Sequence, residues 1–176
     1  MIEIINNNIK LREFTPEDKY RLADLANNKK IAINLRDGFP HPYTLKDAEN
    51  FLNMCSKYDP PQLFAIEYNK LHVGNISLIK GNDVYRKSAE IGYFLGEPYW
   101  NKGIMTIAVN LICDYGFQNL DIERIYTGIF DFNPASQRVL EKCGFTKEAV
   151  FKKAIYKNGV ICDEIRYAKL REEPSI

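Results

Sequence analysis

The order of the expected elements predicts an α/β fold, in which a mixed sheet has helices on both faces. Three observations lead to this prediction. Strand-like segments stand at both ends of the chain, two helical segments follow the first of them, and one strand–helix–strand crossover runs through residues 87–130. Such a crossover joins parallel strands and lays its helix on the sheet. The length of 176 residues suits one domain, which we expect to span residues 1–176.

The first half of the chain is expected to open with a strand or hairpin and to continue with two helices. Residues 2–14 have the strand pattern. The first helix is predicted to start at residues 15–18, because Thr15 can cap, Pro16 suits the first helical position and Asp18 can answer the cap. Thr44-Leu45-Lys46-Asp47 repeats this spacing and predicts a second helix through about residue 57. A stretch rich in turn formers, residues 35–43, separates the two helices.

The second half is expected to contain four strands, two helices and a final hairpin. Strands are predicted over residues 63–68, 71–79, 87–95 and 124–130. Apolar residues at helical spacing predict a helix over residues 103–117. Asn133 is expected to cap a short helix that begins at Pro134 and ends at Gly144. Two last strands, residues 145–156 and 160–170, flank the hairpin signal Lys157-Asn158-Gly159.

Composition narrows the class of protein. The chain is 45% hydrophobic and 27% charged, which is ordinary for a soluble globular protein. A net charge of +1 gives no electrostatic reason to expect a nucleic acid or a membrane as partner. The N-terminus has no signal-peptide pattern, and no apolar run approaches membrane-spanning length. Four cysteines lie far apart without zinc or disulfide spacing, and His41 and His72 are isolated, so we expect a cytoplasmic protein with free thiols and no metal.

The most informative segment is residues 90–117. Its strand pattern meets a short turn, and Asn101-Lys102-Gly103-Ile104-Met105-Thr106 then leads directly into the long helix. The first N–H groups of a helix have no internal partner and lie at the positive end of its dipole. A loop of this kind can bind a diphosphate, although an ordinary strand-to-helix turn has the same small residues.

Two motifs give this segment a family context. Glu90-Ile91-Gly92-Tyr93-Phe94-Leu95 with the loop at 99–106, and Asn133-Pro134-Ala135-Ser136 followed by residues 140–145, resemble the two conserved motifs of the GNAT acyltransferase superfamily. The chain is most similar to the branch that acetylates ribosomal-protein N-termini, the RimJ/RimL-like enzymes. The resemblance extends from Leu11-Arg12 to Tyr167, and it is specific for the superfamily but not for the substrate.

The resemblance implies an N-acetyltransferase that passes an acetyl group from acetyl-CoA to a primary amine by direct attack in a ternary complex. It implies a mostly antiparallel sheet in which the strands at 89–95 and 124–130 splay apart to admit the pantetheine arm. Homodimers are common among such enzymes, so a dimer is possible. The coenzyme-binding residues implied by the motifs are Phe94, Leu95, Asn101, Lys102, Gly103, Ile104, Met105, Thr106, Asn133 and Ser136. The family fingerprint Arg/Gln-x-x-Gly-x-Gly/Ala is altered at both ends, by Trp100 and Met105.

Two residues are candidates for the chemistry. Glu90 lies on the same strand face as Gly92 and Phe94, where a carboxylate can take the amine proton directly or through water. A surface glutamate paired with Lys87 or Arg86 is an equal alternative. Many superfamily members have a tyrosine acid at the position of Leu140, and the N-terminal acetyltransferase branch has a serine where Ser136 stands. Ser136 is therefore expected to donate to the leaving thiolate, the alternative being a hydroxyl of the first helical turn.

The acceptor amine is expected between the 36–43 loop and the final hairpin, as in the family. Plausible walls are Arg36, Asp37, Phe39 and Tyr43, with Glu90 and Asp163 facing the amine; loop packing or surface charge explains each equally well. The acceptor is a protein N-terminal amine or a small molecule, such as a polyamine or an aminoglycoside. The chain has no large acidic cluster, which disfavours a highly cationic acceptor. A coenzyme-binding sensor without turnover is the alternative from another class.

Overall fold

A computed structural model describes residues 3–172 of the chain and contains one eight-stranded sheet. The elements, in chain order, are β1 (Glu3–Asn6), β2 (Ile9–Arg12), α1 (Asp18–Ala26), α2 (Lys29–Ala32), α3 (Leu45–Cys55), β3 (Leu63–Tyr68), β4 (Leu71–Lys80), η1 (Asp83–Tyr85), β5 (Ser88–Leu95), η2 (Glu97–Tyr99), α4 (Ile104–Asn119), β6 (Arg124–Phe130), α5 (Pro134–Lys142), β7 (Thr146–Lys157) and β8 (Val160–Leu170). The strand order is β1-β2-β3-β4-β5-β6-β8-β7. The predicted α/β class and mixed sheet are confirmed.

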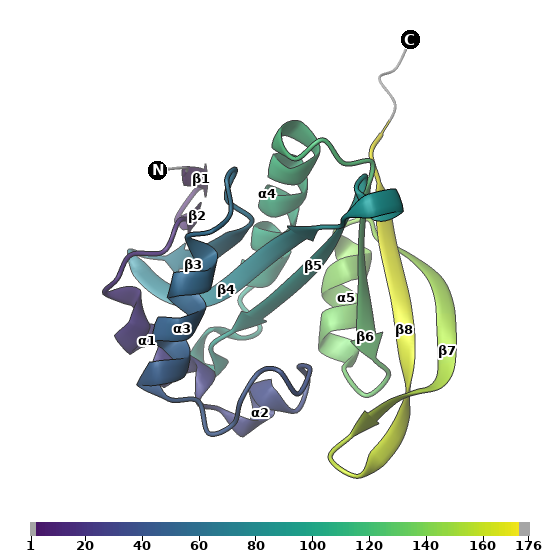
Figure 1. Cartoon of the computed structure of the whole chain (residues 1–176), viewed down its shortest axis with the longest axis horizontal. Coiled ribbons are helices and arrows are strands. Elements are labelled where there is room, and N and C mark those ends of the chain that lie inside the picture. The colour runs from purple at the N-terminus through teal and green to yellow at the C-terminus, as the bar shows by residue number, and fades with distance from the viewer. Residues whose placement is uncertain (1–2, 173–176) are drawn as a thin grey trace.

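The sheet divides where β5 meets β6. Every other neighbouring pair is antiparallel, whereas β5 and β6 are parallel and pair only from Ser88↔Arg124 to Glu90↔Tyr126. Beyond Glu90 the two strands diverge, and their free edges face one another across a gap (Figure 1). The splayed pair implied by the family resemblance is therefore present.

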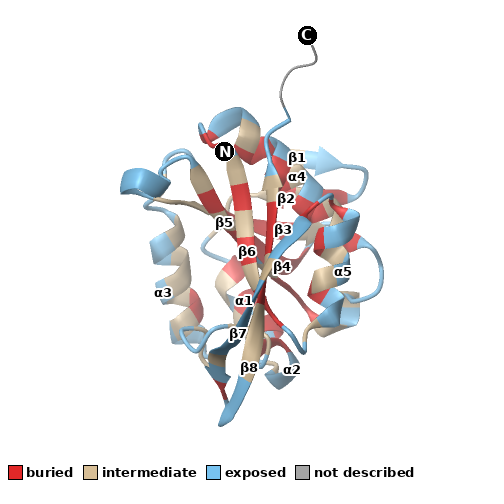
Figure 2. Cartoon of the chain, turned by 90° about the vertical axis from the view of Figure 1, so that its right-hand side faces the viewer, coloured by how far each residue is buried: buried red, intermediate tan, exposed pale blue. Residues whose placement is uncertain are grey.

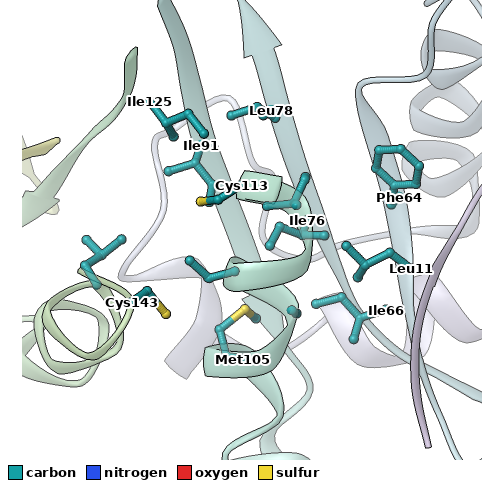
Figure 3. Packing of buried hydrophobic residues seen from close by; sticks show 14 of the residues in the cluster. Leu11, Phe64, Ile66, Ile76, Leu78, Ile91, Met105, Cys113, Ile125 and Cys143 are labelled. Carbon is teal, nitrogen blue, oxygen red and sulfur yellow. The ribbon is translucent and has the colours of Figure 1, made fainter. Parts of the chain in front are cut away.

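Two hydrophobic cores cover opposite faces of the sheet. On one face α4 and α5 pack against inward residues of the strands, among them Ile76, Ile91 and Ile125 (Figure 3). On the other, α1, α2 and α3 enclose a smaller core that includes Leu22, Tyr43, Ala48 and Phe94. Because side chains alternate along a strand, neighbouring residues of β5 enter different cores.

The first predicted helix start is wrong. Helix α1 begins at Asp18, and Thr15 does not cap it through its side chain. Asp18 does answer Thr15 as predicted, because its carboxylate accepts from the Thr15 amide and hydroxyl, and it also receives two bonds from Arg12 at 2.7 and 2.8 Å. A buried carboxylate gains more from a charged partner than from a helix cap. Asp18 at the first position of α1 thus combines the local bonds from Thr15 with an ion pair to Arg12 at the end of β2.

The other local signals are confirmed. Thr44 and Asp47 form a full capping box at α3, and Asn133 caps α5 with Pro134 in its first turn. Asn158 and Gly159 both have positive φ, 50° and 82°, in the turn between β7 and β8. Strand β7 is an edge strand of the sheet, and most of its residues are exposed (Figure 2). Short helix α2 is an element that the sequence pattern did not predict. Within residues 3–172, no helix is long and apolar enough to cross a membrane.

Candidate active site

A cleft of about 1040 Å³ opens at the gap between β5 and β6. Its walls come from β5, β6, the start of α4, α5, the 34–39 loop and the β7–β8 hairpin. All six of the predicted loop residues, Asn101 to Thr106, line it, as do Phe94, Leu95, Asn133 and Ser136. The predicted coenzyme-binding residues are therefore gathered around one cavity.

The start of α4 is shaped to accept a phosphate. Gly103 is its N-cap in the left-handed region, with φ 73°, and no side chain caps the helix. A Cβ built on Gly103 would meet nothing within 4 Å, so the space above the glycine is open. The residues of this first turn line the cleft, and the first N–H groups of a helix have no partner within it. Three basic residues, Lys102, Arg138 and Lys142, also line the cleft and add positive charge to it. An open glycine, free amides and basic side chains fit a diphosphate.

The two departures from the family fingerprint have structural roles. The Trp100 indole Nε1 donates to the Leu95 carbonyl oxygen at 2.7 Å, which fastens the loop to the end of β5. Met105 is buried in the larger core, with 8% of its surface exposed. Neither side chain is needed to bind a phosphate when the main chain supplies the donors, so both substitutions are compatible with the loop's role.

Strand β5 presents different groups to its two faces. Glu90, Gly92 and Phe94 face the side covered by α1–α3, while Ile91 and Tyr93 face α4 and α5. The Gly96 amide bonds to Val73 of β4, so the Leu95 peptide N–H is directed to the opposite edge, at the gap. A Cβ on Gly92 would meet the Ser77 hydroxyl at 3.2 Å, not Tyr99 or Trp100. Because Gly92 has no side chain, it leaves space in the cleft beside Glu90.

Ser136 lies on the α5 side of the gap. Its amide donates to the Asn133 side-chain oxygen at 3.2 Å, as expected for a capped first turn. Its hydroxyl is 2.7 Å from the Tyr93 hydroxyl on β5, and only 8% of the residue is exposed. Leu140, one turn further along α5, is fully buried in the core. Ser136 thus places a hydroxyl group of α5 at the cleft, whereas Leu140 has no polar group to offer.

Glu90 forms an ion pair that the sequence did not predict. Its partner is Arg36 of the loop after α2, and not Lys87 or Arg86. The Arg36 side chain is 70% exposed, whereas that of Glu90 is 29% exposed. Lys87 pairs with Asp121 instead. The Glu90 carboxylate thus lies within the cleft on a strand, whereas the guanidinium of its partner, Arg36, lies on a loop and is mostly exposed to solvent.

Loop and hairpin meet over this side of the cleft. Asp37 accepts from Lys157 of β7 at 2.7 Å, which joins residues 120 positions apart. Phe39 packs on Phe94, with ring centroids 5.6 Å apart. Tyr43 does not line the cleft: it is 7% exposed and supports Phe39 from behind, at a centroid distance of 5.0 Å. Arg36, Asp37 and Phe39 are lining residues, as predicted.

Asp163, like Tyr43, is not a lining residue of the cleft. The next residue, Glu164, lines the cleft in its place. Asp163 accepts from the Lys152 side chain and the Lys153 amide, both at 2.8 Å, and so holds an irregular part of β7. Glu164 lines the cleft, covers Gly128 of β6 and pairs with Arg166 at 2.5 Å. Adjacent strand residues face opposite sides, so the prediction missed the acidic lining residue by one position.

Comparison with known proteins identifies the family. A model described as an acetyltransferase (GNAT) domain matches residues 8–146. The chain belongs to the GNAT acetyltransferase family. The uncharacterized N-acetyltransferase YnaD of Bacillus subtilis is 30% identical to this chain, and the match covers 98% of this chain and 99% of YnaD. The probable N-acetyltransferase YjcK of the same organism is 44% identical over 88 residues, which are only 50% of this chain and 49% of that protein.

Solved structures agree with this assignment. Spermidine N-acetyltransferase from Vibrio cholerae, in complex with CoA and spermine, is 26% identical with a TM-score of 0.79, over 94% of this chain and 96% of that one. RimL, the ribosomal L7/L12 α-N-protein acetyltransferase, was solved with coenzyme A; it shares the fold with a TM-score of 0.86 over 96% and 98% of the two chains, at 22% identity. This GNAT protein is accordingly an acetyl-CoA-dependent N-acetyltransferase, as predicted.

Proposed function

We propose that this enzyme acetylates the α-amine of a peptide N-terminus, or a small amine of similar charge, by direct attack on acetyl-CoA in a ternary complex. The observation that supports the proposal most is the pairing of the carboxylates in the cleft. Asp37, Glu90 and Glu164 are its acidic lining residues, and they pair with Lys157, Arg36 and Arg166.

The charge of the lining disfavours a polyamine. Six lining residues are basic and three are acidic, which leaves a net charge of three positive. Some of this positive charge suits the phosphates of the coenzyme, but a polycation needs several unpaired carboxylates to offset its loss of water. A single amine needs only one. Spermidine acetyltransferases are among the relatives of this chain, so this proposal separates it from them in substrate.

The alternation of β5 supports a direct displacement. Glu90 lies on the α1–α3 side of the sheet and Ser136 on the α5 side, with the splayed gap between them. An amine that approaches from the side of Glu90 attacks a carbonyl held in the gap, and the sulfur departs toward Ser136. Glu90 receives the amine proton, directly or through water, and the Leu95 N–H is placed to donate to the carbonyl oxygen.

Arg36 matters to this proposal because its guanidinium is paired with the Glu90 carboxylate, which the acceptor amine must approach. An acceptor ammonium that approaches Glu90 has the same charge as the guanidinium, and it replaces Arg36 as the partner. The exposed side chain of Arg36 allows this exchange at little cost, since surface ion pairs contribute about 0–1 kcal/mol.

A panel of amines tests the proposal. Release of free thiol from acetyl-CoA is measured with short peptides that have free N-termini, with spermidine and with an aminoglycoside. The same peptides with blocked N-termini are the matched control, because they differ only in the amine. Turnover with free peptides and not with blocked ones is expected. A preference for spermidine refutes the acceptor class, and tight acetyl-CoA binding without turnover on any amine favours the sensor.

A further inference from the structure

The hydrogen bond between Tyr93 and Ser136 has no counterpart in the motifs. Tyr93 comes from β5 on one side of the gap and Ser136 from α5 on the other, 43 positions later, yet their hydroxyl oxygens are 2.7 Å apart. Both residues line the cleft. The Tyr93 ring packs against the larger hydrophobic core, which fixes its position.

The direction of this bond follows from the surroundings of Tyr93. Within residues 3–172, Ser136 is the partner found for the Tyr93 hydroxyl. Burial raises the pKa of Tyr93 above its usual value, and the bond with Ser136 offsets only part of that effect. The phenol therefore keeps its proton, and a buried proton of this kind needs an acceptor. The distance alone allows either hydroxyl to donate, and we assign Ser136 Oγ as the acceptor because a phenol is the stronger acid of the two.

A serine that accepts from Tyr93 keeps its own proton free. The Ser136 oxygen has one O–H to donate and two lone pairs, of which Tyr93 occupies one. The O–H is then turned away from Tyr93 and toward the cleft. A hydroxyl that already accepts a hydrogen bond is also a stronger donor, since successive bonds polarise one another.

We propose that Tyr93 is a positioning residue, which aims the Ser136 proton at the coenzyme sulfur and strengthens that bond as the thiolate leaves. The inference rests on the proposed role of Ser136. The amine nitrogen forms a bond to the acetyl carbon and gives its proton to Glu90, directly or through water, while the carbon–sulfur bond breaks with its electron pair on sulfur. The thiolate leaves hydrogen-bonded to the Ser136 O–H, which Ser136 retains, and takes up a proton from water. Tyr93 keeps its proton throughout, so no tyrosinate forms and no further reactant is needed.

The test removes one oxygen atom. Tyr93→Phe retains the ring and its packing and deletes only the hydroxyl. The matched control is Tyr115→Phe, which deletes the hydroxyl that donates to the Pro61 carbonyl oxygen at 2.8 Å, outside the cleft lining. Loss of one polarising hydrogen bond should lower kcat about 5- to 10-fold in Tyr93→Phe. The dissociation constant of acetyl-CoA and the kcat of Tyr115→Phe should not change.

A second readout needs no acceptor amine. The pKa of the thiol of enzyme-bound CoA is measured from the ultraviolet absorbance of the thiolate, with a thermal melt of each variant to confirm folding. A donor at the sulfur stabilises the thiolate, so Ser136→Ala and Tyr93→Phe should both raise that pKa, the latter by roughly 0.5–1 unit. Tyr115→Phe should leave it unchanged.

The outcomes separate the two ideas. If Ser136→Ala raises the thiol pKa and Tyr93→Phe does not, the role of Tyr93 is refuted and that of Ser136 stands. If neither variant moves it, both roles are refuted. In the Ser136→Ala background, Tyr93→Phe should have no further effect on either quantity. An equal loss of kcat in both backgrounds means that Tyr93 acts through packing, and this also overturns the proposal.

Discussion

The sharpest test of the coenzyme site compares two glycines. Gly103 at the start of α4 and Gly159 in the β7–β8 turn both have positive φ, 73° and 82°, and a Cβ at either would meet nothing within 4 Å. Alanine in the left-handed region costs about 1–2 kcal/mol. For a chain of this length each kcal/mol lowers Tm by roughly 2–4 °C. Gly103→Ala and Gly159→Ala should therefore melt at similar, slightly reduced temperatures.

Their affinities for acetyl-CoA should differ. The methyl group of Gly103→Ala enters the open space where we place the diphosphate. Gly159, in the turn of the β7–β8 hairpin, is not a lining residue of the cleft, so the methyl group of Gly159→Ala stays outside the site. A hydrogen bond to a charged group contributes about 1.5–3 kcal/mol. Displacement of the phosphate from two amides then weakens binding by about 3 kcal/mol or more, which is at least roughly a hundredfold in Kd.

Isothermal titration of both variants and the wild type with acetyl-CoA measures this difference. The backbone strain is present with and without ligand, so it does not contribute to the change in affinity. Wild-type affinity in a folded Gly103→Ala variant would refute the placement of the diphosphate on this loop. Equal losses in both variants would show that the effect comes from destabilisation and not from the site.

Three further predictions concern single side chains. Ser136→Ala should lower kcat by roughly 10²-fold with little effect on acetyl-CoA affinity, because the hydrogen bond from Ser136 to sulfur matters mainly as charge develops on the sulfur. Steady-state kinetics and titration measure the two quantities. An unchanged kcat, with chemistry rate-limiting, would mean that Ser136 is only a hydroxyl of the first helical turn. Glu90→Gln should depress kcat/KM most at low pH, where a neutral amine is scarce, and the deficit should narrow as pH approaches the amine's own pKa of roughly 8; a pH profile identical to wild type contradicts its role as base. Asp18→Asn should lower the free energy of unfolding by about 2 kcal/mol at pH 7, measured in urea, because it removes the charge-assisted bonds from Arg12, which retains its pair with Glu67. Burial alone would raise the pKa of Asp18, but bonds from Arg12 and Thr15 lower it below 3.8, so this stability is present above about pH 4 and is lost as pH falls through the folded pKa; a variant with the same acid sensitivity as wild type contradicts this account.

The sequence by itself determined the features that depend on neighbours along the chain. Thr44 with Asp47, Asn133 with Pro134, and Asn158-Gly159 are local signals, because a cap or a tight turn is completed within a few residues. The same reasoning located the amide-rich start of α4, since the donors at a helix start are unpaired in any fold. These signals gave the α/β class and the phosphate-binding part of the candidate site.

The tertiary structure decided which distant groups meet. Arg12 of β2 bonds both to Asp18 and to Glu67 of β3, which is 55 positions further along the chain. Alternation along β8 separates Asp163 from Glu164, but which of the two faces the cleft depends on how β8 pairs with β6. Glu90 with Arg36, and Tyr93 with Ser136, are 54 and 43 positions apart. Such contacts depend on the divergence of β5 from β6 and on the path of the loops, which local periodicity does not encode.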